Sequence, residues 1–185
     1  SHNGVNFVEK PGKKFMYSGA GHQVIQQVLE EITGKHLYQL MNQYIFRPLK
    51  LTNSTGKILY PGKHKYKLSN MNNCYRLYPE TAAAGVWMSG NDLLKMGMDL
   101  WNSDKYDTGK LLKQETLMLF SNQNIGSYDI IKNRLIFGHS GQNYGYRAGI
   151  SCYPMEGKCT IVLINYNPCC KNGLNKAKKI INNYA

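Results

Sequence analysis

Several features are missing from this sequence of 185 residues. No stretch approaches the ~18–20 consecutive apolar residues that a membrane-spanning helix needs, so we expect no integral membrane segment. No basic stretch followed by an apolar one opens the chain, so the sequence shows no signal peptide. The first residue is Ser1 rather than Met, and we expect the natural beginning to be missing, which leaves the compartment open.

Acidic residues are scarce. The chain has 11 Asp and Glu against 23 Lys and Arg, which gives a net charge of +12. Such a balance favours anionic partners: nucleic acid, an anionic cell-wall polymer or an acidic membrane. The lysines are scattered, however, and no zinc-finger, RNP-like or helix-turn-helix pattern accompanies them. We therefore interpret the charge as a solvated basic surface and expect no nucleic acid partner.

Cysteines at metal-ligand spacing are also absent. None of the five, which are Cys74, Cys152, Cys159, Cys169 and Cys170, forms a Cys-x-x-Cys pair. We expect no zinc or other metal site and no cofactor. Buried thiols are the favoured interpretation. Cys152 and Cys159 face each other across a predicted hairpin, so a disulfide there is an alternative to two neighbouring thiols.

Helical spacing dominates the first part of the chain. Apolar residues predict a helix over residues 24–32, stopped by Gly34. A second amphipathic helix, ended before Pro48, is predicted from Leu37, Leu40, Met41, Tyr44 and Ile45. Residues 52–80 are interpreted as a long surface connection. Ser89 to Asp92 predicts a capping box, with Asp92 as a capping or solvated charge. The inward residues of that helix are expected to be Leu93, Leu94, Met98 and Trp101, and a short helix is expected over residues 113–121.

After residue 121, apolar residues recur at every second position, the spacing typical of strands. Strands are predicted over residues 128–131, 135–139, 146–153 and 158–166, followed by a closing helix that carries Leu174, Ala177, Ile180, Ile181 and Tyr184. Helices, then antiparallel strands, then one helix make an α+β layout. We expect one domain over 1–185, truncated at its N-terminus, with a mainly helical part (17–122) and an antiparallel sheet plus C-terminal helix (123–185).

Three short motifs carry a resemblance. Tyr17-Ser18-Gly19 opens the first helix, Ala82-Ala83-Ala84-Gly85 precedes the third, and His139-Ser140-Gly141 lies on a strand. In this order, and with Arg47-Pro48-Leu49 between them, they resemble the β-lactamase-related, penicillin-binding-protein-like serine hydrolases. That group includes class C β-lactamases, D-alanyl-D-alanine carboxypeptidases and related esterases. The resemblance covers nearly the whole chain and implies a β-lactamase/transpeptidase-like fold.

The resemblance also implies roles for the motif residues. In this family a serine attacks an amide or ester carbonyl and forms an acyl-enzyme that water releases. Tyr17 would help to move the proton, and His139 would hydrogen-bond to Tyr17 or to a substrate carboxylate. Ser140 and Gly141 would line the substrate, with Gly141 allowing a close approach. The backbone N–H of Gln142 would be one of the two oxyanion donors.

The nucleophile is the missing part. The family carries it in Ser-x-x-Lys upstream of the tyrosine motif, and only sixteen residues precede Tyr17. Ser54-Thr55-Gly56-Lys57 matches the spacing, but it follows the tyrosine motif, and Gly56 disfavours a helix. We expect the chain to be the C-terminal portion of such a hydrolase, lacking its nucleophile segment and inactive alone. Gly19, where Asn is commoner, leaves β-lactam or peptide specificity in doubt.

Three functions remain open. The first is amide or ester hydrolysis through an acyl-serine, with a small-molecule or peptidoglycan-peptide substrate, the missing N-terminal segment as partner, and a cell-envelope or secreted location implied by the resemblance. The second is a catalytically inactive family member that acts as a ligand- or cell-wall-binding module. The third, from another class, is a basic nucleic-acid-binding protein. A Ser-x-x-Lys upstream of Ser1 would favour the first.

Overall fold

The computed structural model describes residues 9–59, 78–117, 128–131, 134–153 and 156–165. The helices are α1 (Gly19–Thr33), α2 (Leu37–Met41), the π-helical η1 (Asn42–Phe46) and α3 (Gly90–Tyr106). The strands are β1 (Ser54–Thr55), β2 (Trp87–Met88), β3 (Tyr128–Ile131), β4 (Arg134–Asn143), β5 (Tyr146–Tyr153) and β6 (Lys158–Ile164). The expected closing helix and Cys74, Cys169 and Cys170 lie outside the described residues.

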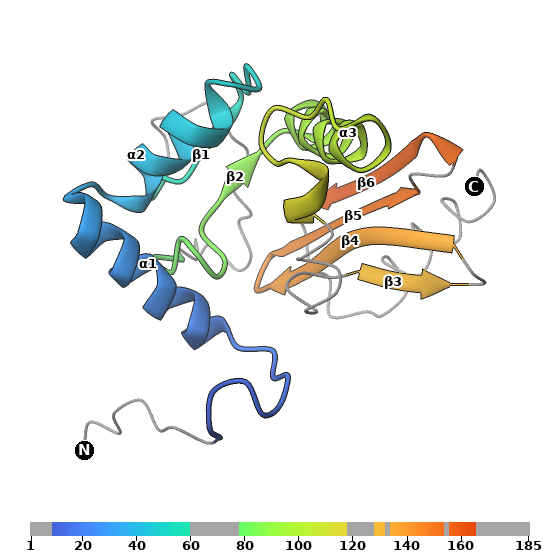
Figure 1. The fold of residues 1–185 in the computed structure, drawn as a ribbon. Coiled ribbons are helices and arrows are strands. Elements are labelled where there is room, and N and C mark those ends of the chain that lie inside the picture. The colour runs from blue at the N-terminus through green and yellow to red at the C-terminus, as the bar shows by residue number, and fades with distance from the viewer. Residues whose placement is uncertain (1–8, 60–77, 118–127, 132–133, 154–155, 166–185) are drawn as a thin grey trace.

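Four strands form an antiparallel sheet in the order β3-β4-β5-β6, and α3 packs against β5 and β6 (Figure 1). The predicted α+β arrangement, helices first and antiparallel strands after them, is confirmed. β4 is longer than expected, because its pairing with β5 continues through Asn143 instead of ending at His139. Tyr144 and Gly145 close the turn, with Gly145 at φ 82°, a backbone conformation that favours glycine.

The hairpin of β5 and β6 has the predicted register. Cys152 pairs with Cys159, and their Cα atoms are 4.0 Å apart. The two cysteines form a disulfide, so the favoured expectation of two neighbouring thiols is wrong. Directly opposed residues in an antiparallel pair bring their side chains close enough to bond, and the two sulfur atoms are bonded here.

Helix α1 begins and ends where the sequence indicates. Ser18 caps it by accepting a hydrogen bond from the Gly21 N–H at 3.0 Å, and Gly34 ends it in the left-handed conformation. Its apolar face is nevertheless uncovered by the described residues: Val24, Ile25, Val28 and Ile32 are 49%, 59%, 52% and 72% exposed. An apolar stripe of this kind needs a packing partner to contribute to stability.

The second helix changes its pitch part-way along. The predicted face includes Tyr44, yet Tyr44 is 62% exposed and Phe46 is buried instead. The cause is η1, because a π-helical turn holds more residues than an α-helical turn and rotates the following side chains. Phe46 then packs with Leu49 and Leu51 to form the buried apolar cluster of this region.

Helix α3 buries small and polar residues rather than only its predicted apolar face. Leu94, expected inside, is 39% exposed, whereas Asp99 and Ser103 are buried. The Asp99 carboxylate accepts hydrogen bonds from the N–H groups of Lys110 and Leu111 at 2.9 and 3.0 Å, which ties down the chain that follows the helix. A buried carboxylate is tolerated because backbone donors satisfy it.

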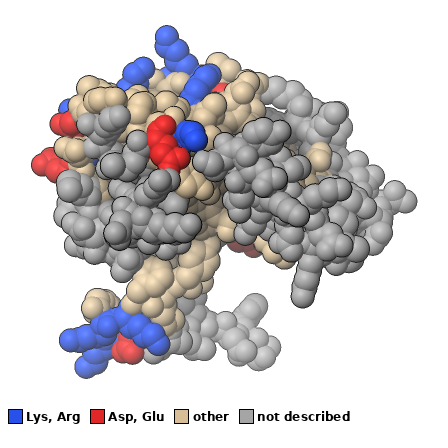
Figure 2. Space-filling model, turned by 90° about the vertical axis from the view of Figure 1, so that its right-hand side faces the viewer, with Lys and Arg blue, Asp and Glu red and all other residues tan. Residues whose placement is uncertain are grey.

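Basic side chains on one face of the molecule form separate groups rather than one continuous patch (Figure 2). One group lies at the lower end, where the segment before α1 carries exposed Lys10, Lys13 and Lys14.

Within the described ranges, no helix has the length and apolar character required to cross a bilayer. In the same ranges, no three His, Cys, Asp or Glu side chains group closely enough to hold a metal ion.

We predict that Gly97→Ala destabilises the fold although alanine is the better helix former by about 1 kcal/mol. A Cβ at this position would lie 2.9 Å from the Cys152 Sγ and 3.1 Å from the Ile150 Cδ1, so α3 has to move off the sheet. We expect a net loss of about 1–3 kcal/mol in the free energy of unfolding, measured by urea titration. Gly90→Ala, where the added Cβ meets nothing within 4 Å, is the control. Equal stability of the two variants would contradict the packing argument.

Candidate active site

Tyr17 and His139 meet although 122 residues separate them in the sequence. The Tyr17 Oη lies 3.4 Å from the His139 Nε2, and the two rings stack with centroids 6.0 Å apart. Tyr17 immediately precedes the N-cap of α1, and His139 lies in the middle of β4. Both side chains are exposed, so the pair is open to a ligand. The predicted proximity of the two residues is confirmed, and their chemical roles stay predictions.

Part of β4 is unpaired on the side away from β5, as far as the described strands go. β3 pairs with β4 only from Arg134 to Phe137, and from Gly138 onward no described strand pairs with β4 on the side away from β5. Gly141 lies on this stretch, and a Cβ there would meet nothing within 4 Å. An extended strand edge with free backbone groups can pair with an extended peptide-like ligand.

Ser140 and Gln142 also lie on β4, opposite Gly149 and Arg147. Successive side chains of a strand point to opposite faces of the sheet, so the side chains of these two residues point away from the face that carries His139. Any contribution of Ser140 and Gln142 on the His139 side therefore has to come from their backbone groups. The structure brings the backbone of the His139-Ser140-Gly141 motif, but not all of its side chains, to the Tyr17 contact.

The Ala82–Gly85 motif lies beside the Tyr17–Gly19 motif. The N–H of Ala82 donates a hydrogen bond to the Gln26 Oε1 at 3.1 Å, which links the turn before β2 to α1. An added Cβ on Gly19 would lie 3.8 Å from the Ala83 Cβ, so the beginning of α1 packs on the same turn. All three motifs that are far apart in the sequence are therefore neighbours, with Tyr17 and Gly19 between the other two.

An aromatic group at the far end of β4 has no counterpart in the sequence prediction. Tyr146, which pairs with Asn143, contacts Trp87 and Tyr78 edge to face at centroid distances of 5.3 and 6.3 Å. The Tyr78 hydroxyl donates a hydrogen bond to the Tyr144 carbonyl at 3.1 Å. These rings join β2 to the β4–β5 turn. The Trp next to the Ala82–Gly85 motif was the sequence signal that could have pointed to them.

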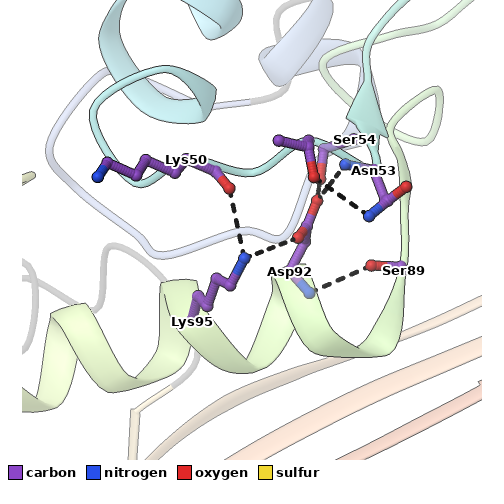
Figure 3. Close-up of polar contacts among 7 residues, drawn as sticks. Lys50, Asn53, Ser54, Ser89, Asp92 and Lys95 are labelled. Carbon is purple, nitrogen blue, oxygen red and sulfur yellow. Dashed lines mark hydrogen bonds and ion pairs between the residues drawn. The ribbon is translucent and has the colours of Figure 1, made fainter.

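Ser54, the formal match to Ser-x-x-Lys, is a structural residue. Its hydroxyl donates a hydrogen bond to the Asp92 Oδ2 at 2.9 Å, and the Asn53 N–H donates to the same oxygen at 2.6 Å (Figure 3). The Lys57 ammonium lies over the Tyr38 ring, 4.9 Å from its centroid. β1, which holds Ser54, is a two-residue strand paired with β2, so the region is neither a helix nor purely a surface connection.

The role of Asp92 differs from the one expected from the sequence. Ser89 does cap α3, since its hydroxyl accepts a hydrogen bond from the Asp92 N–H at 3.2 Å. The Asp92 side chain, however, is 1% exposed and turns to Asn53 and Ser54, so it is not a solvated charge and does not close the predicted capping box. Lys95 pairs with its second oxygen at 3.5 Å and donates to the Lys50 carbonyl (Figure 3).

Comparison with known proteins decides the family. Residues 4–180 match the family model described as Beta-lactamase. The chain belongs to the beta-lactamase family. No curated protein sequence matches this beta-lactamase family chain.

Solved structures show the same fold at low sequence identity. They include an octameric penicillin-binding protein homologue from Pyrococcus abyssi (TM-score 0.60, 21% identity, 86% of this chain and 40% of that one). A D-stereospecific amidohydrolase from Streptomyces sp. matches with a TM-score of 0.61 and 18% identity, over 85% of this chain and 52% of that one. A penicillin binding protein from Bacillus halodurans matches with a TM-score of 0.64 and 15% identity, over 90% of this chain and 55% of that one. The beta-lactamase family chain therefore spans about half the length of these proteins or less.

We predict that Asp92→Ala lowers the stability of this beta-lactamase family chain by about 3 kcal/mol, because the N–H of Asn53 and the hydroxyl of Ser54 lose a buried acceptor. Urea unfolding followed by circular dichroism measures the change. Glu31→Ala, on the exposed surface of α1, is the matched control and should change stability by less than about 0.5 kcal/mol. Equal effects would mean that Asp92 does not hold the β1 segment.

We also predict opposite outcomes for two glycines of β4. A Cβ on Gly138 would lie 2.2 Å from the Ile150 carbonyl oxygen, so Gly138→Ala has to push β4 away from β5. The expected loss is more than about 2 kcal/mol of unfolding free energy. Gly141→Ala adds its methyl group to open space and should be near neutral. If Gly138→Ala unfolds at the same urea concentration as Gly141→Ala, the described pairing of the two strands is wrong.

Proposed function

We propose that the chain forms one wall of the active site of a serine hydrolase that cleaves an amide or ester through an acyl-serine. The observation that carries the proposal is the contact of the Tyr17 hydroxyl with the His139 imidazole at 3.4 Å, beside the part of β4 that no described strand pairs on the side away from β5. Family membership supports the reaction class. A hydroxyl nucleophile needs a proton acceptor in reach and donors for the oxyanion, and this wall holds candidates for both.

In the proposed mechanism each residue has a distinct task. The serine hydroxyl attacks the substrate carbonyl while Tyr17 accepts its proton, directly or through the lysine three residues from the serine. Tyr17 then delivers that proton to the leaving amine or alcohol as the carbon–nitrogen or carbon–oxygen bond breaks. His139 donates a hydrogen bond that stabilises negative charge on Tyr17 or on a substrate carboxylate. Water attacks the acyl-serine in the second half-reaction and releases the acid.

The substrate lies along β4 in this proposal. The backbone from Gly138 to Gln142 pairs with an extended peptide-like or acyl chain, and the side-chain-free surface of Gly141 admits its closest part. The Gln142 N–H is one oxyanion donor, and the N–H of the serine is the other. Peptidoglycan stem peptides, and small amides or esters with such a chain next to the carbonyl group, are both within the proposed substrate class.

We propose that the nucleophile belongs to polypeptide outside these 185 residues. Ser54 is the one serine of the chain with a lysine three residues later, and its hydroxyl is bonded to the buried Asp92. The exposed apolar face of α1 and the span of about half of the similar proteins support an additional segment that packs there. Burying apolar side chains such as Val28 and Ile32 would contribute about 1–2 kcal/mol each.

We predict that the 185-residue chain alone is not labelled covalently by a fluorescent penicillin or a fluorophosphonate, because in this proposal the nucleophile lies outside it. A longer polypeptide with an upstream Ser-x-x-Lys, or that segment added separately, should be labelled on the upstream serine. In that polypeptide Tyr17→Phe should slow acylation at least ~100-fold. Tyr44→Phe, which removes the hydroxyl of another exposed tyrosine, on η1, should leave the rate unchanged.

Two outcomes would change the proposal. Stoichiometric labelling of the 185-residue chain by itself, mapped to Ser54, Ser18 or Ser140, would overturn the assignment of the nucleophile. A longer polypeptide that binds the penicillin reversibly but never forms a covalent adduct would instead support the inactive, ligand-binding member of the family.

A further inference from the structure

A hollow lies in the surface apart from the Tyr17–His139 contact. It has a volume of about 540 Å³ and is formed by the segment after α1 together with α2, η1 and β1. Three cationic side chains line it, Lys35, Arg47 and Lys57, together with the amide side chains of Gln39, Asn42 and Gln43. Among the described residues that line it there is no Asp or Glu. We call this hollow the basic pocket.

The basic pocket is at the opposite end of α1 from Tyr17. Lys35 follows the C-terminal cap of the helix, and Tyr17 precedes its N-terminal cap. Fifteen residues of α-helix separate the two ends, a length of about 22 Å. Figure 1 shows α2 and β1 beyond the C-terminal end of α1, while the chain that contains Tyr17 is at the other end. A ligand in the basic pocket would therefore not overlap with a substrate at His139.

The shape of the basic pocket depends on local features of the fold. The π-helical turn η1 forms one wall, and such turns occur frequently at functional sites because they displace side chains from the α-helical positions. Gly56 forms part of the opposite wall, where a Cβ would come within 3.0 Å of the Met41 Sδ and 3.2 Å of the Thr81 Cγ2. Tight packing at Gly56 holds β1 against α2 and keeps the wall in place.

The positive charges in the pocket contact neutral groups. The Lys35 ammonium donates a hydrogen bond to the Gln43 Oε1 at 2.9 Å, and the Lys57 ammonium lies over the Tyr38 ring. The Arg47 side chain is exposed. The carboxylate behind the wall, that of Asp92, bonds to Ser54 and already pairs with Lys95. Three positive charges therefore share one hollow in which the lining supplies no negative charge.

We propose that the basic pocket binds a small oligoanionic ligand with two or more phosphate or carboxylate groups. Arg47 can hold an oxyanion with two parallel N–H donors, and Lys35 and Lys57 supply two further point charges. The amide groups of Gln39, Asn42 and Gln43 can donate hydrogen bonds to further oxygens. The net charge of +12 increases the encounter rate with such a ligand. The proposal does not depend on the hydrolase activity.

Titration calorimetry of the full 185-residue chain at fixed ionic strength tests the proposal, with inorganic pyrophosphate and citrate as separate probes. We expect saturable binding of at least one probe with one site per chain, and the probe that binds more tightly identifies phosphate or carboxylate as the preferred group. A triple variant with Lys35→Gln, Arg47→Gln and Lys57→Gln should weaken that binding at least tenfold. A control variant with Lys10→Gln, Lys13→Gln and Lys14→Gln removes the same charge elsewhere and should change affinity less than twofold.

The result that overturns the proposal is equal weakening in the two triple variants, because it would assign the binding to overall charge. Failure of both probes to bind the unaltered chain would overturn it as well. Circular dichroism checks that each variant is folded. If the pocket triple variant is not folded, the exposed Arg47→Gln alone is compared with Lys10→Gln, and a difference of less than twofold between them counts against the pocket.

Discussion

The register between β4 and β5 is the constraint on which the rest of the structure depends. Seven residue pairs connect the two strands, from Phe137 with Cys152 to Asn143 with Tyr146. A slip of one residue would move every side chain to the opposite face of the sheet, so His139 would point away from Tyr17. The same register places Ile150 and Cys152 beneath α3, where Gly97 leaves room for them. Sheet, helix and candidate site are thus fixed by one backbone pairing.

Polar contacts tie α1 and the β1 segment to the elements that follow them in the chain. Asp92 joins α3 to the β1 segment, and Gln26 joins α1 to the turn at Ala82. Apolar burial is modest there, because the main cluster contains Phe46, Leu49 and Leu51 while the face of α1 is uncovered. Directional hydrogen bonds can position Tyr17 closely, but they contribute less net stability than an apolar interface of the same extent. This balance is consistent with our proposal of a further segment on α1.

Much of the fold could be predicted from the pattern of residues. The bounds of β3 and β5, the caps of α1 at Ser18 and Gly34, and the pairing of Cys152 with Cys159 all follow from local rules on periodicity, capping and hairpin geometry. The predictions failed where the position of a side chain depends on a distant partner or on a local change of helix type. Asp92 was assigned to its own helix but bonds to Ser54, thirty-eight residues away, and Tyr44 was placed on a buried face that the π-helical turn rotates outward.

By itself, the sequence determined the type and order of α1, α3 and the strands β3 to β6, and its resemblance to the β-lactamase-related hydrolases pointed to Tyr17 and His139 as a pair. Local propensity and alternation are sufficient for the elements, because each depends on neighbours within a few residues, whereas the pair followed from the resemblance. Only the tertiary structure decided that the Tyr17 hydroxyl meets the His139 ring, that Ser54 is bonded to Asp92, that Cys152 and Cys159 form a disulfide, and that three basic residues share one pocket. Those facts depend on how separate elements pack, and packing is set by the whole chain rather than by any segment of it.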